Sequence, residues 1–261
     1  MGHPDGQALH HETTGAGRPL VLLHGGLGTT DMFARVAPAL AAHRRLVMVD
    51  LPGHGRSPAG DRPLRFETMA DDIAGLLRRL DLSGTDLLGY SLGGGVALRL
   101  AIQHPGLVRR LVLVSTPYRR DGWYPEVLAR MDRLTDLATD RESPAYETHA
   151  RVAPDPAGWS TLLARLTDLL GRDYDWSAEV TALAAPTMLV YADADSVRVE
   201  HMAAFFRLLG GGRRDAGWDG TTRPLARLAV LPGLTHYEIV TAPALPAVVV
   251  PFLTEPIRPP T

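Results

Sequence analysis

Short apolar runs alternate with longer segments of helical spacing along most of this chain, and this order restricts the possible folds more than any other feature. Near-continuous hydrophobic runs indicate parallel strands that are covered on both faces. They occupy residues 20–23, 46–49, 86–88, 111–114, 187–191 and 228–231. Segments with helical periodicity separate them, at residues 32–42, 69–80, 96–103, 199–209 and 244–252. The repeated strand-then-helix order predicts an α/β fold with a doubly wound, mostly parallel sheet, to which residues 7–14 could add a leading antiparallel strand.

Residues 117–180 interrupt this alternation, because they contain no convincing strand and have helical spacing instead. The segment holds three of the four Trp and four of the seven Tyr. We interpret it as a helical cap inserted into a core made of residues 1–116 and 181–261. Each ring taken alone is more typical of core packing, but as a group we expect the rings to shape an apolar pocket. The predicted substrate-binding residues are Trp123, Trp159 and Trp176.

The residue types that are absent exclude several chemistries. The chain has no Cys, Lys or Asn, and all 27 basic residues are Arg. A thiol nucleophile, a disulfide, a Schiff-base lysine and a P-loop lysine are therefore excluded. The formal net charge of -2 gives no basic excess to neutralise a phosphate backbone, so no nucleic-acid partner is expected.

No segment predicts a membrane anchor or an export signal. Residues 1–11 are polar, and the longest mostly apolar stretch, residues 242–253, is interrupted by three prolines. We therefore expect a cytoplasmic protein that acts on a small-molecule substrate, and no pattern indicates an oligomeric state. The adjacent His10 and His11 lack a nearby ligand set and are more typical of an incidental surface pair, so neither a metal nor another cofactor is expected.

The strongest local signal is the pentapeptide Gly89-Tyr90-Ser91-Leu92-Gly93, which matches G-x-S-x-G between an apolar strand and a helix. A nucleophile at such a turn has a strained backbone that raises its hydroxyl above the sheet, so the residues two before and two after must be small. The alternative is a glycine-rich connection that contains Ser by chance. The position between strand and helix favours Ser91 as a nucleophile.

His236 and a carboxylate complete the expected catalytic set. A hydroxyl nucleophile needs a base, and the base needs a third group that holds its tautomer. His236 follows the last predicted strand, at the carboxyl end where open α/β sheets place their ligands. Asp193 and Asp195 both follow the strand at 187–191, and strand alternation does not separate them because they are two residues apart.

Two backbone amides are expected to stabilise an oxyanion. The loop His24-Gly25-Gly26-Leu27-Gly28 follows the first apolar run, and the N–H groups of Gly26 and Leu92 form the expected donor pair. We expect His24 to hold its loop by hydrogen bonds rather than to act as a base, and we expect the same of His54.

These motifs together resemble the α/β-hydrolase superfamily, in particular its small cap-bearing esterases, lactonases and carbon–carbon bond hydrolases. HGGLG, DLPGHGRS, GYSLGG, DADS and PGLTH occur in the family's order and span nearly the whole chain. Ala192 stands where the family usually has Gly, three residues before the acid. The resemblance implies the α/β-hydrolase fold and assigns Ser91 as nucleophile, His236 as base, Asp195 as acid, and Gly26 with Leu92 as the oxyanion hole.

The activity that this resemblance implies is that of a cofactor-independent serine hydrolase, which cleaves a small, largely apolar carboxylic ester or lactone through an acyl-enzyme. Carbon–carbon bond hydrolysis or perhydrolysis by the same triad remains open, as does a slow-turnover, receptor-like ligand-binding protein. Ser at position 91, in place of Asp, argues against haloalkane dehalogenase and epoxide hydrolase chemistry.

Overall fold

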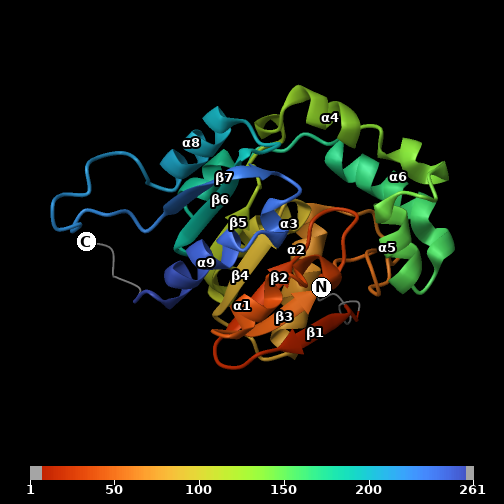
Figure 1. Ribbon diagram of the computed structural model, residues 1–261, viewed down its shortest axis with the longest axis horizontal. Coiled ribbons are helices and arrows are strands. Elements are labelled where there is room, and N and C mark those ends of the chain that lie inside the picture. Colours follow the sequence, from red (N-terminus) through yellow and green to blue (C-terminus); the bar gives the residue numbers. More distant parts are fainter. Residues whose placement is uncertain (1–7, 257–261) are drawn as a thin grey trace.

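A seven-stranded sheet forms the centre of the computed structural model, which describes residues 8–256 (Figure 1). Its strand order is β1-β3-β2-β4-β5-β6-β7. Strand β1 pairs antiparallel with β3, and the other neighbouring strands pair in parallel. The prediction of a doubly wound, mostly parallel sheet is therefore confirmed. The strands are β1 (His11–Thr14), β2 (Pro19–Leu23), β3 (Arg45–Val49), β4 (Thr85–Tyr90), β5 (Val108–Val114), β6 (Thr187–Ala194) and β7 (Arg227–Thr235).

Helices cover both faces of this sheet (Figure 1). Successive side chains of β2 point to opposite faces: Val21 packs in a cluster with α2 and α3, whereas Leu22 packs in a second cluster with α1 and α9. Both are fully buried, which explains why the strands form continuous apolar runs in the sequence. None of the helices in residues 8–256 combines the length and apolar composition needed to span a membrane. The helices of these two clusters are α1 (Ala37–Ala41), α2 (Phe66–Arg79), α3 (Leu92–Gln103) and α9 (Ala244–Thr254). A further helix, α8, spans Val199–Leu208 and connects β6 to the loop before β7.

The first helical segment and the leading strand differ from the sequence prediction. The single helix predicted over residues 32–42 is wrong, since the structure has a 3-10 helix, η1 (Thr30–Phe33), followed by the short helix α1. Pro38 lies in the first turn of α1, where its missing N–H needs no acceptor, so a separate helix begins there. The leading strand is β1, and Gln7, where that prediction began, lies outside the described residues.

Residues 117–180 leave the sheet at the carboxyl end of β5 and return at β6. In this part of the chain the structure has four α-helices and no named strand, only isolated bridges that join Arg119 to Asp175 and Trp123 to Val197. Figure 1 shows α4, α5 and α6 together at one side of the molecule. The helices are α4 (Pro125–Met131), α5 (Pro144–Val152), α6 (Trp159–Leu170) and α7 (Ser177–Thr181).

Candidate active site

Ser91 occupies a sharp turn between β4, which ends at Tyr90, and α3, which begins at Leu92. Its φ of 52 and ψ of -116 lie in a region that residues other than Gly rarely adopt. A side chain at Gly89 would collide with the carbonyl oxygen of Gly93, and one at Gly93 would collide with the backbone carbonyl groups of β2 and His24. The close approach of strand and helix is therefore the physical reason for glycine at both positions.

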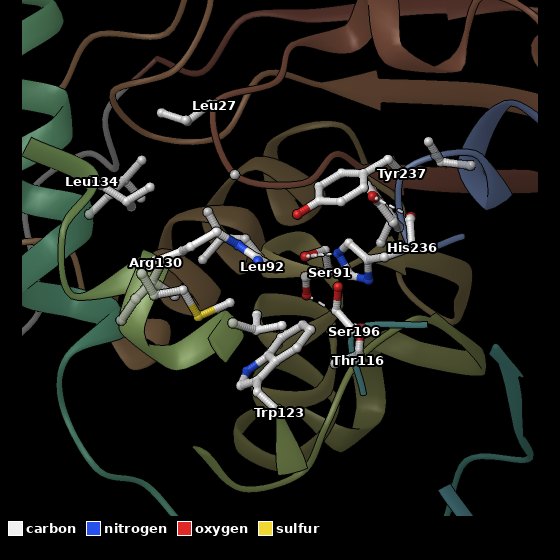
Figure 2. A pocket seen from close by; sticks show the side chains of 18 of the residues that line it. Leu27, Ser91, Leu92, Thr116, Trp123, Arg130, Leu134, Ser196, His236 and Tyr237 are labelled. Carbon is white, nitrogen blue, oxygen red and sulfur yellow. Dashed lines mark hydrogen bonds between the residues drawn. The ribbon is translucent and has the colours of Figure 1, made fainter. Parts of the chain in front are cut away.

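Ser91, His236 and Asp195 form one hydrogen-bonded chain at the carboxyl ends of the strands. Figure 2 shows Ser91 and His236 side by side. The His236 Nε2 lies 3.1 Å from the Ser91 Oγ, and its Nδ1 lies 2.9 Å from the Asp195 Oδ1. Because a carboxylate can only accept, Nδ1 carries the proton and Nε2 is left as an acceptor for the serine hydroxyl. The arrangement suits proton transfer from Ser91 to His236.

The surroundings of Asp195 favour its ionised form. Burial opposes ionisation, but hydrogen bonds from His236, Ser115 and the Ala192 amide lower the pKa of Asp195 below its ordinary value. By contrast, Asp193 is exposed and accepts from the Leu234 amide, 3.2 Å away. The geometry thus puts Asp195, and not Asp193, beside the imidazole.

Gly26 and Leu92, the expected oxyanion donors, face each other across the turn. A Cβ built on Gly26 would lie 3.9 Å from the Leu92 Cβ, and both residues line the same cavity as Ser91. Leu92 is the first residue of α3, so its amide has no acceptor within the helix. Neither amide donates to another residue in the described part of the chain. Both N–H groups are therefore available to a bound oxyanion.

His24 is the first residue of the loop 24–28 that carries Gly26, which we call the oxyanion loop, and both His24 and His54 are fully buried. The His24 Nε2 accepts from the Leu51 amide at 3.0 Å, and its Nδ1 lies 2.7 Å from the Gly25 carbonyl. Burial lowers the pKa of His24, and burial together with the neighbouring His24 lowers the pKa of His54 to about 3. Both rings are therefore neutral, and the contacts of His24 hold the loop, as its position in the sequence predicted.

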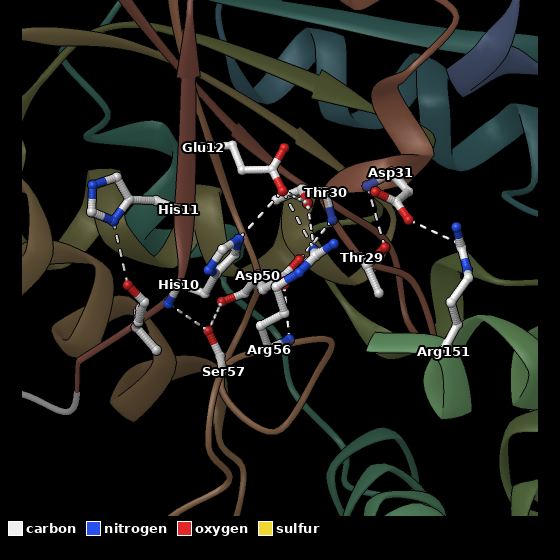
Figure 3. Close-up of polar contacts among 11 residues, drawn as sticks. His10, His11, Glu12, Thr29, Thr30, Asp31, Asp50, Arg56, Ser57 and Arg151 are labelled. Carbon is white, nitrogen blue, oxygen red and sulfur yellow. Dashed lines mark hydrogen bonds and ion pairs between the residues drawn. The ribbon is translucent and has the colours of Figure 1, made fainter. Parts of the chain in front are cut away.

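A buried carboxylate joins the loops that follow β2 and β3 (Figure 3). Asp50 accepts from the Thr30 amide at 2.7 Å and from the Arg56 amide at 2.9 Å, and its side chain is fully buried. The Ser57 hydroxyl donates to the Asp50 carbonyl oxygen. Because Thr30 begins η1, two residues after the end of the oxyanion loop, Asp50 connects the segment that follows this loop to the turn at Arg56.

The cavity above Ser91 has a volume of about 890 Å³ and walls that are largely apolar. In Figure 2, Trp123 and Tyr237 lie on opposite sides of Ser91 and His236. The Trp123 ring packs edge-on against the His236 ring, with their centroids 5.5 Å apart. Charged side chains also contribute to the lining: Asp31, Arg35, Arg130, Arg133 and Asp136. Its apolar lining includes Leu27, Met32, Val127, Met131, Leu134, Leu166, Leu170 and Val240.

Of the three tryptophans predicted to bind substrate, the structure brings only Trp123 to this cavity. Trp159 is fully buried and its Nε1 donates to the Leu137 carbonyl oxygen. Trp176 packs against Phe66 and Tyr174, which themselves line the cavity, so it stands one layer behind the wall. The expectation for Trp159 and Trp176 is corrected, because their rings fill the packing between helices.

Tyr90 and Ser115 support the site through hydrogen bonds to His236 and Asp195, although the sequence analysis did not single out their roles. The Tyr90 hydroxyl donates to the His236 carbonyl oxygen at 2.8 Å, which fixes the backbone that carries the imidazole. Tyr90 directly precedes Ser91 in the G-x-S-x-G motif, and this position was the one signal in the sequence for its role.

Within residues 8–256 no group of three or more His, Asp and Glu side chains could hold a metal ion.

Comparisons with known proteins agree on one family. The family model described as alpha/beta hydrolase fold matches residues 18–210. A pimeloyl-[acyl-carrier protein] methyl ester esterase of Chromobacterium violaceum is 34% identical over 240 residues, which cover 87% of this chain and 91% of that protein. A 2-hydroxymuconate semialdehyde hydrolase of a Pseudomonas species is 42% identical over 144 residues, covering 49% and 50%. The structure of an enol-lactonase from Burkholderia xenovorans matches with a TM-score of 0.72 at 24% identity, covering 96% and 98%.

Replacing Asp50 by Ala is expected to destabilise the fold strongly. The change leaves the Thr30 and Arg56 amides without their acceptor, and each buried unsatisfied donor costs about 1–3 kcal/mol. Thermal or urea unfolding measures the loss. Asp31→Ala is the control, because Asp31 forms an exposed ion pair with Arg151, which contributes about 1 kcal/mol or less. Equal losses in the two variants would show that Asp50 does not join the loops.

Proposed function

Since this chain belongs to the alpha/beta hydrolase fold family, we propose that it is a serine hydrolase that cleaves a small, largely apolar carboxylic ester or lactone without a cofactor. The observation that carries this proposal is the chain of hydrogen bonds from Ser91 through His236 to Asp195, which opens into a largely apolar cavity. The esterase relative and the enol-lactonase structure agree with an ester or lactone as the substrate class.

The proposed reaction has two halves that share one base. The Ser91 hydroxyl attacks the substrate carbonyl while His236 takes its proton, and the amides of Gly26 and Leu92 stabilise the tetrahedral oxyanion. His236 then returns the proton to the departing alkoxide, and the acyl group stays on Ser91. A water that His236 deprotonates then attacks the acyl-enzyme and forms a second tetrahedral intermediate. When this intermediate collapses, the acid is released and His236 returns the proton to the Ser91 oxygen, which restores the serine hydroxyl. Ionised Asp195 keeps the imidazole oriented and stabilises its protonated form.

Carbon–carbon bond hydrolysis is the second candidate. The semialdehyde hydrolase relative favours it, because the 42% identity extends over about half of both chains. In that reaction Ser91 would attack an aldehyde or ketone carbonyl while His236 takes its proton, and the leaving carbanion would then receive that proton from His236. The two activities are separated by comparing kcat/KM for an apolar p-nitrophenyl ester with that for 2-hydroxymuconate semialdehyde, the compound named for the relative.

Sustained turnover tests the enzyme assignment itself. With a chromogenic ester in excess, an enzyme releases product linearly over many turnovers. A receptor-like protein instead shows one slow acylation, equal in amount to the protein, followed by almost no further release. The second outcome would overturn the proposal.

Ser91→Ala is expected to abolish ester turnover while the fold and ligand binding persist. The change removes the nucleophile but leaves the cavity walls in place, so kcat should fall on the order of 10⁶-fold if the site follows the serine protease precedent. A fluorophosphonate should label wild-type Ser91 once, as detected by peptide mass, and should not label the variant. Activity near that of the wild type would exclude the covalent mechanism.

The two carboxylates at the carboxyl end of β6, Asp193 within the strand and Asp195 directly after it, should differ sharply when each is changed to the amide. Asp195→Asn preserves the shape of the site but favours the wrong imidazole tautomer of His236, and kcat should fall by about 10⁴. Asp193→Asn is the matched control, since Asp193 is exposed and contacts only backbone amides. Steady-state kinetics with one ester measures both variants, and the reverse ranking would assign the acid to Asp193.

Substitutions at Trp123 and Trp176 should distinguish a residue that sets substrate selectivity from one that only packs behind the cavity wall. Trp123→Phe widens the cavity beside His236, so the ratio of kcat/KM between long-chain and short-chain esters should change by about 10-fold, since one methylene of fit is worth about 1–3 kcal/mol. Trp176→Phe should lower the melting temperature and leave the ratio unchanged, because the ring lies behind the cavity wall. An equal shift of the kcat/KM ratio in both variants would contradict the placement of Trp123 in the cavity wall and of Trp176 behind it.

A further inference from the structure

A second cavity, of about 580 Å³, is lined by five arginines and one acidic residue. We call it the arginine pocket. Its other walls include Pro186, Leu225 and Phe252, which give it an apolar side. The arginines are Arg110, Arg213, Arg214, Arg223 and Arg227, and the acid is Glu255.

The arginine pocket lies at the end of the sheet opposite Ser91. Arg110 is near the beginning of β5, Pro186 directly precedes β6, and Arg227 is the first residue of β7. These three strands are parallel neighbours, so their amino ends meet at one edge of the sheet. Ser91, Asp195 and His236 follow carboxyl ends, at the other edge. The two cavities are therefore separate sites.

The positive charge of the arginine pocket is largely unpaired. Arg227 forms an ion pair with Glu255 at 3.2 Å. Among residues 8–256, no carboxylate lies within ion-pair distance of Arg110, Arg213, Arg214 or Arg223, the remaining four arginines of the lining. Arg213, Arg214 and Arg223 belong to the loop between α8 and β7, residues 209–226. The acids of this loop, Asp215 and Asp219, accept hydrogen bonds from nearby amides and do not line the cavity.

Arg110 is built into the protein rather than free on its surface. Only 2% of the residue is exposed, and its guanidinium packs over the Phe252 ring, 5.3 Å from the centroid. Its Nη2 donates to the Glu255 carbonyl oxygen, but its buried Nε has no acceptor in the described part of the chain. Burial and the neighbouring Arg109 lower the pKa of Arg110. A buried guanidinium with an unsatisfied donor is stabilised by an anion within reach.

We propose that the arginine pocket binds a small molecule that carries two or more linked phosphate groups. Guanidinium forks match the spacing of phosphate oxygens and bind them through two parallel hydrogen bonds. Four unpaired arginines exceed what a single carboxylate needs, whereas a diphosphate carries enough charge and acceptors for them. Phe252 and Leu225 offer an apolar surface to the organic part of such a ligand. The site is a concave cavity on a chain whose formal net charge is -2, which favours a small ligand over a nucleic acid.

Calorimetric titration of the full chain with pyrophosphate and with ADP, at constant ionic strength, tests the proposal. We expect saturable binding of at least one of the two, with an accompanying rise in melting temperature. Tighter binding of ADP would assign the apolar wall to the nucleoside, and equal binding would assign recognition to the diphosphate alone. Either result supports the site. Absence of saturable binding of both probes would overturn it.

A pair of double variants distinguishes the arginine pocket from general charge attraction. Arg214→Gln with Arg223→Gln removes two exposed arginines of the pocket and should weaken binding by at least about tenfold. Arg78→Gln with Arg172→Gln removes the same charge from exposed arginines outside it and should leave the affinity unchanged. Equal weakening in the two variants, or loss of binding after fluorophosphonate labels Ser91, would contradict the proposal. Ester turnover should be the same in both variants, so the result is independent of the proposed hydrolase activity.

Discussion

The left-handed backbone at Ser91 is the constraint on which the rest of the site depends. A non-glycine residue in this region costs about 1–3 kcal/mol, and it persists only where its surroundings hold it. The Ser91 amide donates to the Val114 carbonyl oxygen, which extends the pairing of β4 with β5 by one residue. At the other end of the turn, the Gly95 amide donates to the Ser91 carbonyl oxygen and begins α3. Glycines at 89 and 93 then let α3 approach the sheet closely enough for the turn to close.

The same backbone conformation recurs on the neighbouring strand. Ser115 follows β5 with a φ of 52, and its amide donates to the Val190 carbonyl oxygen of β6. Its hydroxyl donates to Asp195, whereas the hydroxyl of Ser91 lies against His236. Two serines with the same unusual φ therefore hold opposite ends of one hydrogen-bonded chain. Since Asp195 also accepts from the Ala192 and Val197 amides, its carboxylate is stabilised by donors from the sheet and from the loop that follows it.

The sequence predicted the elements whose residues are constrained locally. The apolar run at β2 needs burial on both faces, and the glycines around Ser91 need the close strand–helix contact, so both features are visible without a structure. The choice between Asp193 and Asp195 was different. The pairing of β6 with β7 shifts register between Ala192 and Ala194, so regular alternation no longer decides where the following side chains point. Only the resemblance to the family separated the two carboxylates.

Aromatic composition could not separate cavity residues from packing residues. Trp123 and Trp176 are both nearly buried tryptophans of the same inserted segment, yet one contacts the His236 ring and the other packs behind Phe66. The difference arises from contacts between segments far apart in the chain, such as the bridge from Trp123 to Val197, just after β6. Burial alone therefore predicts that a ring is inside the protein, but not which surface it faces.

Parallel strands give the sheet two edges with different chemistry. At the carboxyl edge, the segments that follow β4, β6 and β7 bring together the Ser91 hydroxyl, the Asp195 carboxylate and the His236 imidazole. At the amino edge, the fully buried Asp86 lies between Arg44 and Arg109 and is the carboxylate nearest to both. Burial raises the pKa of Asp86, although hydrogen bonding and charge from Arg109 oppose that rise. One carboxylate cannot neutralise two guanidinium groups, and the adjacent Arg110 adds a third. The excess positive charge at this edge therefore arises from the core of the sheet itself, and the exposed arginines of the loop between α8 and β7 only extend it.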